Sequence, residues 1–137
     1  MNVSINYLAV VVAAAVSFII GGIWHGPLFG KAEMAGRGAT PEEVAAGPKP
    51  KPTQMLAVFI VLLVVAWALA LLSGYLHLAT WMQGLKLGVV CWVGFSTTTF
   101  LLEHIMTSGR KSAVLYIDVT SWLITYAVSG VLVTLWH

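Results

Sequence analysis

The chain has 137 residues, of which 59% are hydrophobic and 9% are charged. Soluble domains carry a charge on about a quarter of their residues, so this composition excludes an ordinary soluble domain. The formal net charge of +2 gives no basic surface of the kind that nucleic acid requires. The single cysteine, Cys91, cannot form a disulfide within the chain.

Four long apolar stretches occupy most of the sequence. A helix of roughly 20 residues crosses the ~30 Å hydrocarbon core of a bilayer, and lipid forces each stretch to satisfy its own backbone hydrogen bonds. We therefore predict an all-α integral membrane protein, in which residues 1–137 form a single domain built as a compact four-helix transmembrane bundle. The predicted helices cover about 5–24, 54–75, 85–106 and 113–136.

The first apolar stretch is predicted to be a retained helix. It is long enough to span the membrane, and no basic residue precedes it, unlike a cleavable signal peptide. Gly26-Pro27 should end this helix, because proline lacks the N–H that would continue it.

One longer loop, residues 25–53, separates the first two helices. Thr40 followed by Pro41 and two glutamates is typical of a helix start, so a short helix is predicted at about 41–46. The alternating Pro-Lys run at 48–52 favours a stiff, extended segment.

The basic residues are divided unequally between the two sides of the membrane. Cytoplasmic loops are enriched in Lys and Arg, so the first and third loops should be cytoplasmic and both termini outside. Only Lys86 lies on the opposite side. The basic residues of the two loops are Lys31, Arg37, Lys49, Lys51, Arg110 and Lys111.

Small residues spaced four apart predict where helices pack closely, because their short side chains let two backbones approach. This helix-packing set consists of Ala13, Ser17 and Gly21 in the first helix and Gly84 and Gly88 at the start of the third.

Polar residues mark one face of the third and fourth helices. Because the rest of each helix is apolar, this face is predicted to line the interior of the bundle or of an assembly. The lining candidates are Ser96, Thr99, Ser121, Thr125 and Ser129.

Acidic residues and histidines are predicted to form a polar layer near the cytoplasmic side. Glu103 and Asp118 are almost equally far from the tight loop around Arg110, so at ~1.5 Å rise per residue they reach a similar depth. His25 and His104 should arrive at the same level. Charged groups within spans are costly and usually mark a function or a partner. The alternative is a structural layer, in which the acids pair with the loop's basic residues or cap local hydrogen bonds.

Catalytic and cofactor signatures are lacking. The sequence has no Gly-rich phosphate loop, paired-cysteine motif, nucleophile elbow or His-Glu-x-x-His helix. A metal held by His25, Glu103 and Asp118 would have suitable ligand types, but sequence spacing alone does not establish it. Haem ligation by paired histidines is disfavoured, because His77 lies in a loop and His137 is the last residue. We predict no enzyme, no catalytic residue, no metal and no cofactor.

Three segments carry a resemblance to a known family. They are Gly22–Lys31 (GIWHGPLFGK), Trp92–Phe95 (WVGF) and Tyr116–Asp118 (YID). In this order they resemble the signature of a bacterial membrane family catalogued as domain of unknown function 1761. The resemblance covers essentially the whole chain. It implies a small four-helix protein of the bacterial cytoplasmic membrane, with no established activity to carry over.

The leading functional hypothesis is passage of a small solute or ion, with proton coupling as one form of it, along the polar faces of helices 1, 3 and 4. Four helices enclose little space, so a homo-oligomer is expected to supply the pathway. The alternative is an accessory or assembly subunit of a larger membrane complex. In either case the partners are the lipid bilayer and other membrane proteins, with no nucleic acid.

Overall fold

The computed structural model describes residues 2–137, and every regular element among them is helical. Four helical spans are long and apolar enough to cross a membrane, which confirms the predicted all-α class and makes the chain a multi-pass membrane protein. They are Tyr7–Leu28, Pro52–Tyr75, Trp81–Met106 and Ser112–Leu135.

Two of these spans contain a stretch of π-helix. The elements in chain order are α1 (Tyr7–Ile23), η1 (Trp24–Leu28), α2 (Gly30–Gly36), α3 (Pro41–Ala46), α4 (Pro52–Tyr75), α5 (Trp81–Cys91), η2 (Trp92–Thr97), α6 (Thr98–Met106) and α7 (Ser112–Leu135).

The loop between the first two spans is more helical than predicted. Helix α3 forms where expected, with a capping box in which the Thr40 hydroxyl accepts from the Glu43 amide and the Glu43 carboxylate accepts from the Thr40 amide. Helix α2 was not predicted.

The first span also does not end at Gly26-Pro27, so that prediction is wrong. Pro27 lies inside η1, and the amide of Phe29 donates to the carbonyl of Trp24, five residues earlier. This wider π-helical spacing keeps the chain on a helical course past the proline, which has no N–H to donate.

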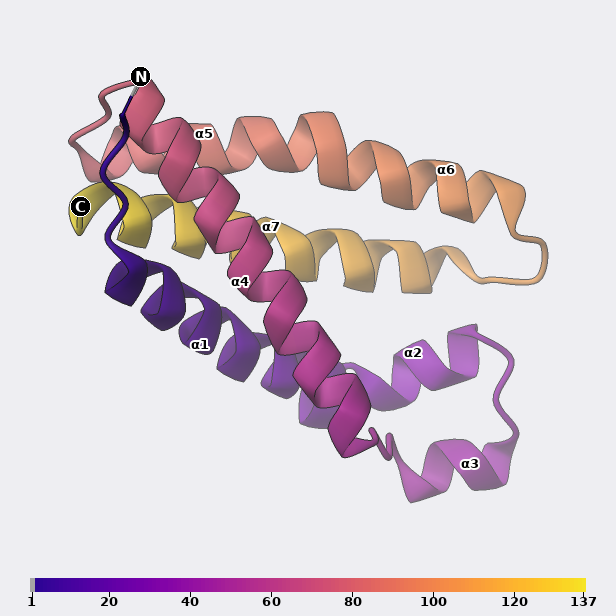
Figure 1. Cartoon of the computed structure of the whole chain (residues 1–137). Helices are drawn as coiled ribbons and strands as arrows, with labels where there is room; N and C mark the ends of the chain where they lie inside the picture. The colour runs from indigo at the N-terminus through magenta and orange to yellow at the C-terminus, as the bar shows by residue number, and fades with distance from the viewer. Residues whose placement is uncertain (1) are drawn as a thin grey trace.

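Helix α7 is the centre of the bundle. It is the most buried of the four spans, and it packs against α1, α4 and α5. Figure 1 shows the two chain termini close together at one end of the molecule, whereas α2, α3 and the α6–α7 turn lie at the other end. We call the latter the α2 end.

Glycines allow α5 and α7 to approach until their backbones touch. A Cβ atom added at Gly84 would collide with the carbonyl oxygen of Gly130, and one at Gly88 would collide with the carbonyl of Tyr126. These two glycines therefore lie where the helix-packing prediction places them.

The small residues of α1 behave differently along the helix. Ala13 and Ser17 are fully buried. Gly21 lies outside this contact, contrary to the packing prediction, because a Cβ added there would meet no described atom within 4 Å. Gly21 is half-buried, and Gly22 and Ile23, which end the helix, are exposed.

Candidate functional site

Four charged or ionisable side chains meet at the α2 end of the bundle. His25 Nδ1 lies 2.7 Å from Glu33 Oε2, and Arg37 donates to Glu33 Oε1 at 2.7 Å and to Asp118 Oδ2 at 3.2 Å. His25 comes from η1, Glu33 from α2 and Asp118 from α7, and Arg37 is the residue that directly follows α2. We call these four residues the charged cluster.

The charged cluster depends on how closely α2 lies against its neighbours. A Cβ added at Gly30 would collide with the backbone carbonyl of His25, and one at Gly36 would collide with the side chain of Val114. The amide of Lys111 also donates to the Gly36 carbonyl at 3.2 Å. Glycine at both ends of α2 therefore allows the helix to bring Glu33 and Arg37 to α7.

Two tryptophans hold the segment of α7 that carries Asp118. The indole N–H of Trp24 donates to the Ile117 carbonyl at 3.0 Å, and that of Trp92 donates to the Val119 carbonyl at 2.8 Å. These acceptors flank Asp118 directly in sequence. Because η1 and η2 supply the donors, both π-helical stretches help to orient the same acid.

The two carboxylates of the cluster are well shielded from solvent. Their side chains are 14% exposed in Glu33 and 12% in Asp118, against 43% in Arg37. Burial by itself would raise the pKa of Glu33, but the hydrogen bond to His25 and the charges of His25 and Arg37 outweigh it, so the pKa lies below its usual value. Arg37 supplies the fixed positive charge that offsets the two acids, as buried carboxylates require.

The structure divides the predicted polar layer into two groups. His25 and Asp118 belong to the charged cluster. Glu103 instead pairs with Arg110, as the structural alternative to the polar layer expected. Glu103, His104 and Asp118 do line one small hollow of about 10 Å³. No hydrogen bond joins Glu103 to Asp118 in the described part of the chain.

Sequence reasoning missed Glu33 and Arg37. One signal was present, because an acid and a base four residues apart pair on one helix face. The predicted loop at residues 25–53 had no helix at this position, so a pair between Glu33 and Arg37 was not expected.

Buried hydroxyl side chains follow one face of α7 away from the charged cluster. The Ser121 hydroxyl lies 3.0 Å from His25 Nε2, and the Ser129 hydroxyl lies 3.3 Å from that of Ser17 on α1. Thr125, between them, is also buried.

A separate hydroxyl pair lies at the other end of α7. The Thr134 hydroxyl lies 2.8 Å from that of Ser73 on α4, and both residues are buried. Thr134 is five residues beyond Ser129, so it lies on a different face of the helix. We call Asp118, Ser121, Thr125 and Ser129 the polar row of α7.

The lining candidates of the third span do not share a face. Ser96 is buried, whereas Thr99 is exposed and its hydroxyl donates to the Phe95 carbonyl of its own helix at 2.6 Å. Thr99 therefore does not line the bundle interior in this chain, which corrects the prediction. The wider turns of η2 rotate α6 relative to α5, so the regular helical spacing used for the prediction does not hold across Ser96 and Thr99.

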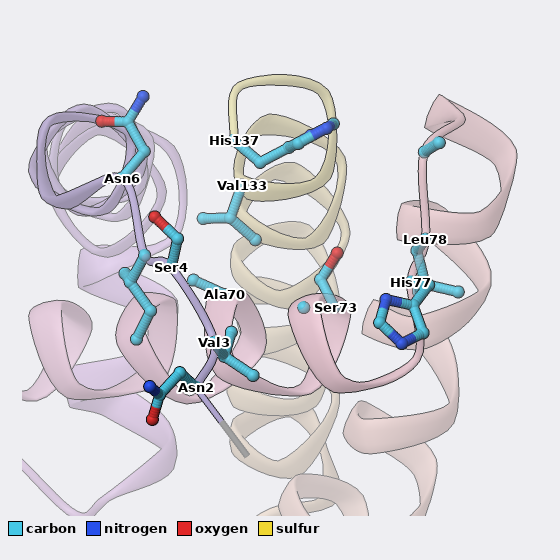
Figure 2. Close-up of a pocket in the computed structure, with 13 residues that line it drawn as sticks. Asn2, Val3, Ser4, Asn6, Ala70, Ser73, His77, Leu78, Val133 and His137 are labelled. Atoms are coloured by element: carbon cyan, nitrogen blue, oxygen red, sulfur yellow. The ribbon is translucent and has the colours of Figure 1, made fainter.

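A cavity of about 340 Å³ lies at the opposite end of the polar row. Figure 2 shows side chains of the N-terminal segment, the end of α4 and the end of α7 around it, including Asn6, Ser73, His77 and His137. Val133 of α7 also lines this cavity, and it lies one helical turn beyond Ser129. The polar row thus runs from the charged cluster to within one turn of the cavity wall.

The donor atoms of His25, Glu33 and Asp118 all lie within 4.8 Å of one another. Among the described residues, this group is the one whose side chains could hold a metal ion. It differs from the ligand set considered from the sequence in having Glu33 in the place of Glu103.

Comparison with known proteins agrees with the resemblance seen in the sequence. No curated protein and no solved structure matches the chain. A family model described as "Protein of unknown function (DUF1761)" matches residues 8–134. The chain therefore belongs to the DUF1761 family, as a multi-pass helical membrane protein whose charged cluster and polar row meet on α7.

Proposed function

We propose that this protein passes a small polar solute or an ion across a bacterial cytoplasmic membrane, along the polar row of α7. The observation that supports the proposal is the continuity of that row. It begins at Asp118 in the charged cluster and ends at Ser129, one helical turn before Val133 in the wall of the cavity at the other end.

The position of the polar row favours a pathway for a solute or ion over a role in helix packing alone. Hydroxyl pairs also hold transmembrane helices together, each contributing about 1 kcal/mol. Packing alone, however, does not require polar groups on successive turns of the same face, with a charged cluster at one end and a cavity one turn beyond the other.

The bundle is closed in this structure. Thr125 and Ser129 are buried against neighbouring helices, with exposures of 6% and 1%. Passage therefore requires α1 and α4 to move away from α7, or several copies to assemble. We propose that several copies assemble into a homo-oligomer, because four helices offer little interior of their own.

Flux from purified protein in liposomes tests the proposal. Asp118→Asn should abolish solute or ion flux while the protein stays assembled, because it removes the charge at the entrance to the polar row. Glu103→Gln is the matched control, since that acid lies at the same end but pairs with Arg110 instead. Repeating the assay with and without a pH gradient tests proton coupling.

Two results would count against a transport role. One is the lack of flux for a broad set of ions and small polar solutes in the unmodified protein. The other is an Asp118→Asn variant that loses thermal stability but keeps the flux of the parent, which would make the charged cluster structural.

A non-catalytic accessory or assembly subunit is the second candidate, and glycines with uncovered faces favour it. A Cβ added at Gly21, Gly22 or Gly94 would meet no described atom within 4 Å. Such small-residue surfaces on transmembrane helices let a helix of another protein approach closely. This role predicts stable co-purification with a larger membrane protein, lost in Gly22→Leu, and no flux from the isolated chain.

A further inference from the structure

The charged cluster contains the ligand types of a transition-metal site. His25 offers an imidazole nitrogen, and Glu33 and Asp118 each offer carboxylate oxygens, all within 4.8 Å of one another. The three ligands come from three elements, η1, α2 and α7, so the fold and not a local turn brings them together. We propose that these three side chains bind one divalent first-row transition-metal ion, for which Zn²⁺ is the probe.

Ser121 orients the imidazole for this role. Its hydroxyl lies 3.0 Å from His25 Nε2, on the side of the ring away from Glu33. When Nε2 carries the hydrogen and donates it to Ser121, Nδ1 presents its lone pair to the Glu33 carboxylate, 2.7 Å away. Two acceptors that close need a positive charge between them, either a proton or a metal ion. Metal-binding histidines are commonly held through their second nitrogen in this way.

Arg37 is the built-in competitor for the metal. Its guanidinium contacts Glu33 Oε1 and Asp118 Oδ2, so it holds by charge the two carboxylates that a metal ion would bridge. Its side chain is 43% exposed and lies at the end of α2, so it can turn outward into solvent. On metal binding, the divalent ion would then replace the single positive charge of Arg37 beside Glu33 and Asp118.

The ligand set also indicates which ions fit. Hard ions such as Mg²⁺ prefer oxygen ligands alone and keep several waters, whereas an imidazole with two carboxylates suits Zn²⁺ and its neighbours in the first transition row. Bonds of about 2.0–2.2 Å would draw the three donor atoms closer than they lie here. Of the three elements, α2 is the one outside the membrane spans, so we expect it to make that adjustment. The inference concerns binding, and it stands whether or not the protein passes a solute.

Isothermal titration calorimetry on the purified, metal-free protein in detergent tests the proposal. We expect one Zn²⁺ per chain, with Mg²⁺ bound at least about 100-fold more weakly. His25→Gln and Glu33→Gln should each weaken Zn²⁺ binding by at least about tenfold, because each removes a ligand. His77→Gln and His137→Gln are the matched controls, and they should bind like the parent.

Arg37→Gln should strengthen Zn²⁺ binding, a result that misfolding of the variant would not produce. Removing the competing charge should tighten Zn²⁺ binding by about tenfold or more. Zn²⁺ should also raise the melting temperature of Arg37→Gln by more than that of the parent. In this variant Glu33 and Asp118 have lost the positive charge of Arg37, and the bound ion replaces it. The proposal is overturned if Arg37→Gln leaves the affinity unchanged, or if Zn²⁺ binding survives in His25→Gln and disappears in the His77 or His137 variant.

Discussion

Glu33 connects three parts of the molecule through one carboxylate. One of its oxygens lies against His25 of η1, and the other accepts from Arg37, which in turn reaches Asp118 of α7. Losing the charge on Glu33 would therefore loosen α2 from both neighbours. Because the pKa of Glu33 is held below its usual value, the native state favours its ionised form.

This coupling predicts a particular loss of stability in acid. A carboxyl whose pKa is lower in the folded than in the unfolded state contributes stability that is present above the unfolded value, 4.5 for Glu33. That contribution is lost as the pH falls through the lower folded-state pKa. In metal-free detergent solution, the parent should lose thermal stability as the pH is lowered from about 5. Glu33→Gln should be less stable than the parent at pH 6 and should change less with pH below 5.

Glu42→Gln is the control for general acid effects, because Glu42 is an exposed acid on α3. It should follow the pH curve of the parent. If Glu33→Gln also follows that curve, the carboxylate of Glu33 does not stabilise the folded state in the way its contacts indicate.

At the scale of elements, the sequence predicted the positions of the helices better than the contacts between distant segments. Hydrophobic length was sufficient for the four spans, and the capping pattern at Thr40 was sufficient for α3. Depth counting brought His25 and Asp118 to one level, where the structure has both. Depth does not determine which side chain fills the space beside Asp118, because that depends on contacts between distant segments such as Arg37 and α7.

The π-helical stretches explain further differences. Regular spacing of 3.6 residues per turn predicts which side chains share a face, and a wider turn ends that regularity. Thr99, in α6, faces outward for this reason, while Ser96, within the wide turns of η2, is buried. The residues of η1 and η2 do not predict a π-helical turn, apart from Pro27 in η1.

Close contact between α5 and α7 predicts different outcomes for two glycines. Gly88→Leu should destabilise the protein by ~1–3 kcal/mol, because a side chain at this position meets the backbone of Tyr126, which cannot move aside cheaply. Gly21→Leu should have little effect on the unfolding of a single chain, since a Cβ atom at this position would meet no described atom within 4 Å and leaves room for the side chain. Unfolding of both variants in detergent micelles measures the difference.

Equal stability of the two variants would contradict the packing of α5 on α7. The oligomeric state should be measured in the same samples. If Gly21→Leu leaves the monomer stable but dissociates an oligomer, the uncovered face of α1 is the contact between copies.

For the whole molecule, the two ends differ in both charge and structure. The loop helices α2 and α3 and the α6–α7 turn lie at one end, and the chain termini lie at the other (Figure 1). The α2 end also carries most of the lysines and arginines, including Lys49 and Lys111. The charged cluster, the proposed entrance to the polar row, is at the same end.

The positive-inside rule therefore predicts that the α2 end faces the cytoplasm. In a Cys91→Ala background, single cysteines at Lys49 and Lys111 should resist a membrane-impermeant thiol reagent applied to intact cells and should react after the cells are opened. A cysteine at Ala79, in the short connection between α4 and α5, should react in intact cells and serves as the control. The opposite pattern would place the charged cluster outside, so that Zn²⁺ or a transported ion would reach His25, Glu33 and Asp118 from the exterior. The same three cysteines thus decide the orientation of the bundle and the side from which the cluster is loaded.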